Sequence, residues 1–292
     1  MLPKSDRSLG VILGVLGMLC FSGTLVATRV AVTDFTPIDI TLVRIVIAGL
    51  LGTAFLLLSK GCIRPQSEHM LSLLIMGLGT AVGYPFFLAL ALETVPAVHG
   101  AVVTGLAPAA TAIVAVLRAG ERPTWVFWIA CLTGFCAVLY FAYDEGGGHL
   151  SLADGWLVLG MLCLGISYVE GGLVSRKLGG LRAFCWAMVP LMPIAIVLLA
   201  WRINWSDLQA TTLQSWVSLS YLGIFSMFLG SVFWYRGLAI GGIARVGQIN
   251  LLLPLMALLW AVLFLSEKVS WTAAGCAVVV LISMLVCLKS RG

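Results

Sequence analysis

The stretch PAATAIVAVLRAGERPTW occupies residues 108–125, and a second stretch, PLMALLWAVLFLSEKVSW, occupies residues 254–271. In each, a proline is followed after thirteen residues by glutamate, then by a basic residue, and four residues after the glutamate by tryptophan. The copies lie 146 positions apart, half of the 292-residue chain. At an offset of 147 the match continues upstream with the pairs Gly83/Gly230, Ala97/Ala244, Gly100/Gly247 and Arg29/Arg176. This periodicity predicts two repeats, residues 1–146 and 147–292.

The composition predicts that the chain resides in a lipid bilayer. Hydrophobic residues make up 61% and charged residues 10% of the chain, and the mean hydropathy is +1.09. Soluble domains have about 45–50% apolar and about 25% charged residues, so this chain has too little polar surface for a soluble fold. The net charge of +5 is spread over single or paired basic residues. Such a distribution does not favour binding to nucleic acid.

Ten apolar stretches are long enough to be spanning helices, each of which needs about 20 residues. They are roughly Leu9 to Val32, Ile38 to Leu58, Met70 to Leu92, Ala97 to Arg118, Trp125 to Tyr143, Asp154 to Val174, Leu181 to Trp201, Trp216 to Ala239, Ala244 to Ser266 and Trp271 to Leu288. Each repeat then holds five spans. Because five is odd, the second repeat enters the membrane from the opposite side. The predicted fold is an all-α integral membrane protein with ten transmembrane helices arranged as two inverted five-helix repeats.

The distribution of basic residues predicts the orientation. Of 17 Lys and Arg residues, 13 lie on one side, which the positive-inside rule places in the cytoplasm together with both termini. Lys4 and Arg7 precede an apolar stretch too long for a signal peptide, so we expect an uncleaved first span. Seven of the ten tryptophans lie at span ends, where interfacial anchors are common.

Prolines inside the apolar stretches point to candidate binding positions. A mid-helix proline leaves the carbonyl four residues earlier without its helical partner, so Pro108 would free Thr104 and Pro254 would free Asn250. These positions are equivalent in the two repeats. They either line a substrate cavity or are purely structural kinks. The same reasoning applied to Pro85 and Pro190 singles out two aromatic residues as further cavity walls, Tyr84 and Trp186.

Few ionisable residues fall inside the spans. We expect Arg29, Arg44 and Arg236, near span ends, to extend toward the interface. Glu170, two positions after Tyr168, is a coupling candidate that could bind a proton or an ammonium group. The alternative is an interfacial carboxylate paired with a neighbouring basic residue, Arg176 or Lys177. His99 begins the fourth predicted span and is either a helix-end polar residue or a ligand. Gln248 and Asn250 in the ninth span need either hydrogen-bond partners or a wet cavity, and these three residues complete the predicted substrate site.

Other features favour packing over chemistry. The eight cysteines lack metal-site or disulfide spacing and are interpreted as small packing residues, and no cofactor or metal is expected. There is no P-loop, His-Glu-x-x-His helix or Gly-x-Ser-x-Gly elbow, so we do not expect an enzyme. Small-xxx-small spacings that permit close helix approach occur at Gly10/Gly14, Gly79/Gly83 and Gly237/Gly241.

The segment from Thr36-Pro37 to Arg44, the segment from Pro108 to Glu121-Arg122 and its copy from Pro254 to Glu267-Lys268 resemble signatures of the EamA type of the drug/metabolite transporter superfamily. The resemblance covers the whole chain and implies ten spans in two repeats. In overall sequence character the chain is most similar to the YddG-type bacterial exporters. That likeness implies efflux of aromatic amino acids across a bacterial inner membrane, with a cavity between spans 1–4 and 6–9, and with spans 5 and 10 peripheral.

The inventory of neutral polar groups and aromatic residues suits a zwitterionic amino acid, whereas a phosphorylated substrate would require buried Lys or Arg, which the sequence does not predict. The alternatives are an exporter of another small neutral metabolite or drug, a channel, and a lipid-modifying enzyme. The expected partners are a small-molecule substrate and membrane lipids, with no nucleic acid. The oligomeric state and the coupling ion both stay open. A monomer is compatible with the sequence.

Overall fold

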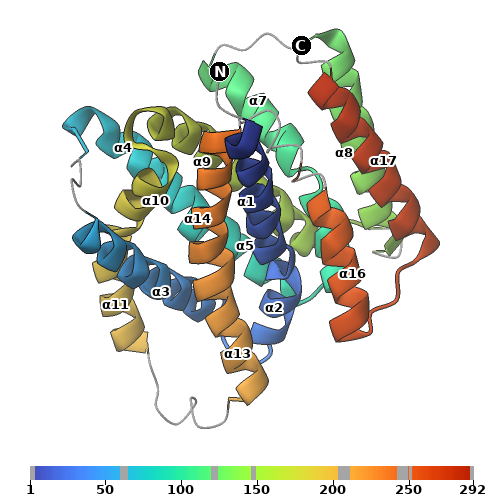
Figure 1. Cartoon of the computed structure of the whole chain (residues 1–292). Coiled ribbons are helices and arrows are strands. Elements are labelled where there is room, and N and C mark those ends of the chain that lie inside the picture. The colour runs from blue at the N-terminus through green and yellow to red at the C-terminus, as the bar shows by residue number, and fades with distance from the viewer. Residues whose placement is uncertain are drawn as a thin grey trace.

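The computed structural model describes residues 4–59, 65–119, 124–145, 149–202, 211–241, 249 and 252–289. Throughout these ranges the regular structure is helical (Figure 1). The first half of the chain contains α1 (Lys4–Ser22), α2 (Thr24–Ala31), α3 (Pro37–Leu58), α4 (Ser67–Gly77), the π-helix η1 (Leu78–Gly83), α5 (Tyr84–Leu92), α6 (Ala97–Thr104), α7 (Ala107–Ala119) and α8 (Trp125–Glu145). The second contains α9 (Leu152–Leu178), α10 (Gly180–Met188), α11 (Leu191–Arg202), α13 (Leu213–Tyr221), the π-helix η2 (Leu222–Leu229), α14 (Gly230–Gly241), α16 (Leu253–Leu265) and α17 (Trp271–Lys289).

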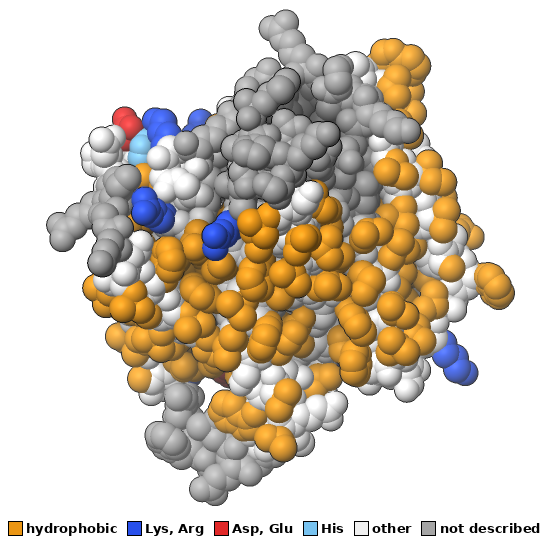
Figure 2. Space-filling view, in the orientation of Figure 1, with side chains coloured by type: hydrophobic (Ala, Val, Ile, Leu, Met, Phe, Trp, Pro, Cys, Tyr) orange, Lys and Arg blue, Asp and Glu red, His pale blue; other side chains and the backbone are white. Residues whose placement is uncertain are grey.

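The helices form a multi-pass membrane protein. Within the described residues, seven continuous helical segments are long and apolar enough to cross a bilayer. They are Ser8–Ala31, Pro37–Leu58, Ser67–Leu92, Trp125–Asp144, Leu152–Ser175, Gly180–Arg202 and Leu213–Gly237. Three shorter apolar helical segments accompany them, Ala97–Thr111, Leu253–Leu265 and Trp271–Ser283. Figure 2 shows a broad band of hydrophobic side chains across one face of the molecule, with Lys and Arg side chains at its margins. Such a band is suited to contact with lipid.

Local sequence sets several helix starts. Thr36 caps α3 by accepting a hydrogen bond from the Asp39 N–H, and Pro37 occupies the first turn, where its missing N–H costs nothing. Ser151 and Asp154 form a capping box at the start of α9. Thr212 caps α13 through the N–H of Ser215. These polar residues fix where each apolar helix begins.

Helices from the two halves of the chain pack against each other. α1 packs along α14, and α9 packs along α4, η1 and α5. In the numbering of the predicted spans, these contacts join span 1 to span 8 and span 6 to span 3. α3 packs with α11 and α8 with α17, which lie at matching positions in the two halves, and α6 packs with α16. In Figure 1 the α8/α17 pair lies side by side at one edge of the molecule.

Glycines allow the closest of these approaches. A Cβ atom on Gly237 of α14 would lie 2.8 Å from the backbone nitrogen of Gly14 and 2.9 Å from the carbonyl oxygen of Gly10, both in α1. A Cβ on Gly83 would lie 2.8 Å from the Cβ of Cys163 in α9. The small-xxx-small spacings therefore mark helix crossings where backbone meets backbone, as their sequence predicts.

Pro108 and Pro254 lie at helix starts, and this corrects the prediction that they kink the middle of a helix. Pro108 is the second residue of α7, after a break at Gly105 and Leu106, and Pro254 is the second residue of α16. Proline is tolerated in a first turn because the N–H groups there have no helical acceptor. Pro85 differs, because it lies inside the continuous helical segment Ser67–Leu92, where the π-helix η1 passes into α5.

Candidate functional site

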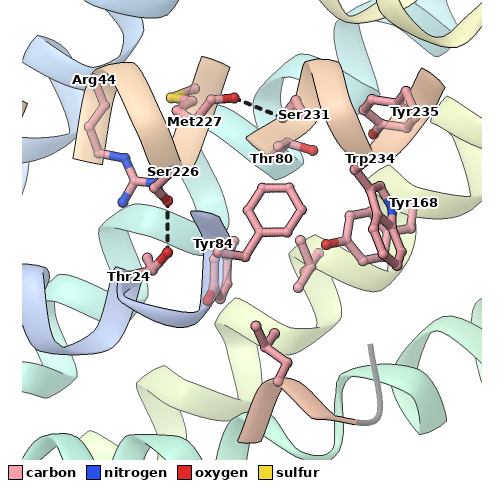
Figure 3. Close-up of a pocket in the computed structure, with 13 residues that line it drawn as sticks. Thr24, Arg44, Thr80, Tyr84, Tyr168, Ser226, Met227, Ser231, Trp234 and Tyr235 are labelled. Atoms are coloured by element: carbon pink, nitrogen blue, oxygen red, sulfur yellow. Dashed lines mark hydrogen bonds between the residues drawn. The ribbon is translucent and has the colours of Figure 1, made fainter. Parts of the chain in front are cut away.

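A cavity of about 70 Å³ lies between helices from both halves of the chain (Figure 3). Aromatic residues form much of its wall, namely Phe21, Tyr84, Tyr168, Trp234 and Tyr235. Hydroxyl-bearing residues contribute the polar part, namely Thr24, Thr80, Ser226 and Ser231. Arg44, Leu164, Met227 and Leu253 complete the lining. The cavity thus combines an aromatic body, several hydroxyl groups and one cationic side chain.

Both π-helices contribute to this lining, Thr80 from η1 and Ser226 and Met227 from η2. η1 ends at Gly83, and η2 ends immediately before Gly230, its equivalent in the second repeat. π-Helical turns are rare and occur frequently at functional sites, because they widen the helix and redirect its side chains. Their matched occurrence in two spans supports a site at this place.

Two hydroxyl pairs fasten the helices around the cavity. Thr24 Oγ1 and Ser226 Oγ are hydrogen-bonded at 2.7 Å, and Thr80 Oγ1 and Ser167 Oγ are hydrogen-bonded at the same distance. Each pair joins a helix from the first half of the chain to one from the second half, α2 to η2 and η1 to α9. In a bilayer, a hydroxyl without a partner is unfavourable, so these bonds satisfy groups that would otherwise be buried alone.

The lining contains pairs of residues that lie 147 positions apart, the offset of the predicted repeat. At an offset of 147, Phe21 corresponds to Tyr168, Thr80 to Met227 and Tyr84 to Ser231, and all six line the cavity. The sequence singled out only Tyr84 and Tyr168. The offset of 147 between Gly83 and Gly230 could have identified Ser231 as the counterpart of Tyr84 and Phe21 as the counterpart of Tyr168.

Arg44 is the residue that the sequence placed incorrectly. It is only 3% exposed and lines the cavity, whereas we predicted that it would extend to the interface. From the second turn of α3, the side chain could extend toward the membrane interface or point into the protein. Packing of α3 against η2, α10 and α11 directs it inward. Arg44 Nη2 lies 3.5 Å from Ser226 Oγ. Within the described part of the chain, Nε and Nη1 have no hydrogen-bond partner. The expectation that buried Lys or Arg is absent was therefore wrong.

Two other predicted site residues lie outside the cavity lining. Thr104 ends α6, and its hydroxyl donates to the Ala101 carbonyl at 3.1 Å. Trp186 belongs to α10 and packs against a core cluster that includes Phe184 and Tyr235, while its Nε1 has no hydrogen-bond partner among the residues that the structure describes. Gln248 and Asn250 lie outside the described residues.

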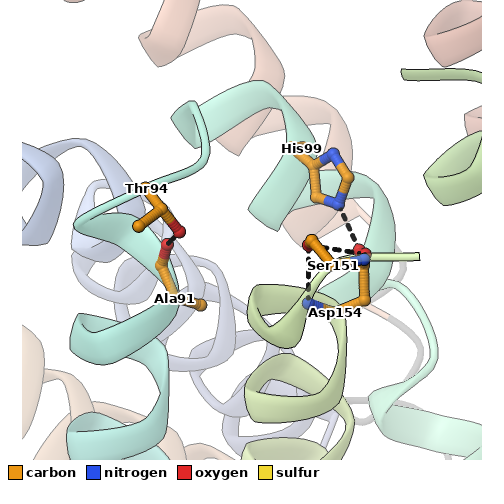
Figure 4. A network of polar contacts seen from close by, with 5 residues as sticks. All are labelled: Ala91, Thr94, His99, Ser151 and Asp154. Atoms are coloured by element: carbon orange, nitrogen blue, oxygen red, sulfur yellow. Dashed lines mark hydrogen bonds and ion pairs between the residues drawn. The ribbon is translucent and has the colours of Figure 1, made fainter. Parts of the chain in front are cut away.

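His99 is engaged in a polar network away from the cavity (Figure 4). It is 5% exposed, and its Nε2 lies 2.6 Å from Asp154 Oδ1. Oδ2 of the same carboxylate accepts hydrogen bonds from the backbone and side chain of Ser151. The His99 ring also packs against Phe141, with ring centres 5.0 Å apart. This geometry joins α6 to the start of α9.

Glu170 lies near the other end of α9 and is 3% exposed. Its carboxylate accepts hydrogen bonds from the Arg118 side chain and from the Ser72 hydroxyl, the latter at 2.7 Å. The predicted alternative partner Lys177 instead lies 3.4 Å from Glu68, and the side chain of Arg176 is not described. Local sequence suggested neighbours on α9, but the partner comes from α7 because α7 packs alongside α9. Glu170 does not line the cavity.

A second cavity, of about 320 Å³, lies among α7, α8 and α9. Its lining includes Leu106, Ile113, Trp128, Phe135 and Leu162 and carries no charged residue. Apolar walls of this kind can hold a lipid chain but offer few groups to recognise a polar solute. The smaller cavity between the repeats is therefore the better candidate for solute binding.

The comparisons with known proteins agree with this architecture. The sequence profile described as "EamA-like transporter family" matches residues 8–143 and again residues 151–289. The "Uncharacterized transporter YdeK" of Bacillus subtilis (strain 168) is 42% identical over 274 residues, which cover 93% of this chain and 94% of that protein. The "WAT1-related protein At3g02690, chloroplastic" of Arabidopsis thaliana is 25% identical over 291 residues, which cover 91% of this chain and 69% of that protein.

A solved crystal structure also shares the fold. It covers 98% of this chain and 98% of its own, with a TM-score of 0.63 at 20% sequence identity. The family profile accounts for nearly the whole chain, and a relative at 42% identity is a transporter by name. The chain is therefore a multi-pass membrane protein that belongs to the EamA-like transporter family.

Proposed function

We propose that this protein is a secondary transporter that moves a small solute by alternating access through the cavity lined by Tyr84, Tyr168 and Arg44. Two inverted five-span repeats, residues 1–146 and 147–292, would exchange conformations around that cavity. We place it in a bacterial inner membrane with both termini in the cytoplasm. Aromatic amino acids are the first substrates to test, and other small metabolites or drugs are the second.

The single observation that carries this proposal is the repeat-related lining of the cavity. Three pairs of residues at an offset of 147 meet around one space, and each pair takes one member from each half of the chain. The matched helix pairs and the two ranges recognised by the family profile support the same division. A site on the axis relating two similar halves is exposed first to one side and then to the other when the halves exchange shapes.

The aromatic wall supports an aromatic solute. Tyr84, Tyr168 and Trp234 offer ring faces and edges on which another ring can pack. A cavity of about 70 Å³ has room for several water molecules. In the proposed mechanism, the helices of the two halves move apart to admit the solute.

Counterflow in proteoliposomes tests this function. Liposomes containing the purified protein and loaded with unlabelled phenylalanine or tryptophan should accumulate the labelled amino acid transiently, with saturable rates. Ser231→Trp, which fills the cavity, should abolish counterflow. Ile282→Trp is the matched control, because Ile282 is 55% exposed on the outer surface of α17. Flux that neither saturates nor responds to loaded substrate would contradict a transporter and favour a channel.

Cysteine labelling in intact cells tests the orientation. A cysteine at Gly147 should react with an impermeant probe, whereas cysteines at Arg64 and Gly292 should react only after the cells are opened. Labelling of position 292 from outside would contradict the even number of spans and the inversion of the repeats.

A further inference from the structure

Arg44 leaves most of its hydrogen-bonding capacity unused inside the membrane region. A guanidinium remains protonated and offers five N–H donors. At 3% exposure Arg44 has one long contact, 3.5 Å from Nη2 to Ser226 Oγ. Its Nε and Nη1 atoms have no partner among the described residues. A buried charge without a counter-charge is strongly unfavourable and in membrane proteins marks a site of function.

Among the described residues, the cavity lining provides no counter-charge for Arg44. None of its thirteen lining residues is acidic. The acidic side chains that take part in described contacts have partners elsewhere: Asp34 with Thr212, Asp39 with Arg202, Glu68 with Lys177, Asp154 with His99, Glu170 with Arg118, and Glu267 with the start of α6. Within the described part of the chain, no acidic side chain pairs with Arg44. A negatively charged group on a bound solute would complete this site.

The surroundings of Arg44 define the rest of that solute. Figure 3 shows the Arg44 guanidinium beside Ser226, at one side of the cavity, with Tyr84, Tyr168 and Trp234 across it. An anionic group bound at Arg44 would leave an apolar or aromatic body facing these rings. The same lining offers hydroxyl groups but no carboxylate for an ammonium group.

Resting on the transport function proposed above, we infer that Arg44 binds the carboxylate of the transported solute, and that the substrate class is an aromatic monocarboxylate. A guanidinium binds both oxygens of a carboxylate through Nε and Nη2 or through Nη1 and Nη2, and Nη2 carries a second N–H besides the one directed at Ser226. The solute's amino group is dispensable. Aromatic amino acids then belong to the class through their carboxylate, and the corresponding 2-hydroxy acids belong to it equally.

Competition experiments separate carboxylate from ammonium recognition. Proteoliposomes containing the full chain are assayed for uptake of labelled phenylalanine in the presence of phenyllactate, which lacks the ammonium group, or phenylalaninamide, which lacks the carboxylate. Phenyllactate should compete and phenylalaninamide should not. Equal competition by the amide would overturn the inference.

Substitution of Arg44 provides a second test of carboxylate binding. Arg44→Gln should raise the apparent KM about 10- to 100-fold, the factor expected for losing hydrogen bonds between charged groups. Arg44→Lys should retain part of the activity, because it keeps the charge but not the paired donors. The matched control is Arg236→Gln, at an exposed arginine of α14, which should leave KM unchanged. An unchanged KM in Arg44→Gln would overturn the inference.

Thermal unfolding of the purified protein in detergent distinguishes binding from transport. Phenyllactate should raise the Tm of the wild type and not that of Arg44→Gln. Without ligand, Arg44→Gln should be at least as stable as the wild type, because an unpaired buried charge is removed. A large loss of stability would show a structural role and overturn the inference.

If the wild type binds phenyllactate through Arg44 but moves no solute, the carboxylate site stands and the transport function fails. If phenyllactate leaves the wild-type Tm unchanged, the site fails.

Discussion

Glu267 caps the helix that begins at Ala97, 170 residues earlier in the chain. Its Oε1 accepts the Ala97 N–H at 2.9 Å, and its Oε2 accepts the Val98 N–H at 2.8 Å. The residue preceding α6 is Pro96, whose side chain cannot cap a helix. A glutamate from the loop between α16 and α17 therefore satisfies the free N–H groups of α6 and places negative charge at the positive end of its dipole.

Glu267→Ala should lower the free energy of unfolding by about 0.5–2 kcal/mol, the range for losing a helix cap. The two N–H groups of α6 would lose their acceptors. Glu267→Gln should fall between the wild type and the alanine variant, because its amide oxygen can accept one bond. Thermal unfolding in detergent ranks the stabilities of the wild type and the two Glu267 variants. Glu93→Gln, the same change at an exposed carboxylate before α6, is the control and should have no effect. An equal effect of both glutamine variants would contradict the capping role.

Gly237→Ala should destabilise the pairing of α1 with α14. The added Cβ would lie 2.8 Å from the Gly14 nitrogen, and backbone cannot move aside without separating the helices. We expect a loss of about 1–3 kcal/mol, the usual cost of overpacking. The matched control is Gly172→Ala in α9, where a Cβ meets nothing within 4 Å. The control should be neutral or stabilising by up to about 1 kcal/mol. Similar Tm values for the two variants would show that α1 and α14 are not closely packed.

Arg118→Ala should be more destabilising than Glu170→Gln. Removing the arginine leaves a buried carboxylate without its charged partner, whereas neutralising Glu170 leaves an arginine side chain that is 57% exposed and can be solvated. Both variants should retain transport per folded molecule, because neither residue lines the cavity. Chemical unfolding and counterflow on the same preparations check this. Loss of transport by folded Glu170→Gln would instead give the carboxylate a role in coupling.

The Asp34–Thr212 contact should make stability depend on pH. The Thr212 backbone N–H and hydroxyl both donate to Asp34 Oδ2, at 2.8 and 2.7 Å, and lower the pKa of this carboxyl below its ordinary value. A lowered pKa in the folded state means that the contribution is present above the ordinary value near 3.9 and is lost as pH falls through the lowered value.

Comparing the wild type with Asp34→Asn therefore isolates this contact. The wild type should have the higher Tm at pH 6, and the difference should shrink as the pH falls below about 4. Asp144→Asn, at an exposed carboxylate of α8, is the control. A Tm difference that stays constant with pH would show that the contact does not depend on the charge of Asp34.

Much of the candidate site was within reach of the sequence. The repeat register already related Tyr84 to Ser231 and Phe21 to Tyr168, and prolines or neighbouring charges drew attention to Tyr84 and Tyr168. Arg44 was misplaced because hydropathy only locates it near a span end. A long basic side chain there can extend to the interface or turn inward, and the choice depends on which helices surround it.

The sequence by itself determined the membrane class and the apolar segments, because these depend on composition and spacing along the chain; the repeat that relates the two halves stays a prediction of the same spacing. Tertiary structure alone decided that Arg44 faces a cavity, that Glu170 pairs with Arg118, and that Glu267 caps α6. In a membrane helix both the lipid-facing and the buried sides are apolar, so hydrophobic periodicity says little about which side faces inward. That information lies in contacts between residues distant in sequence, which exist only once the helices have packed.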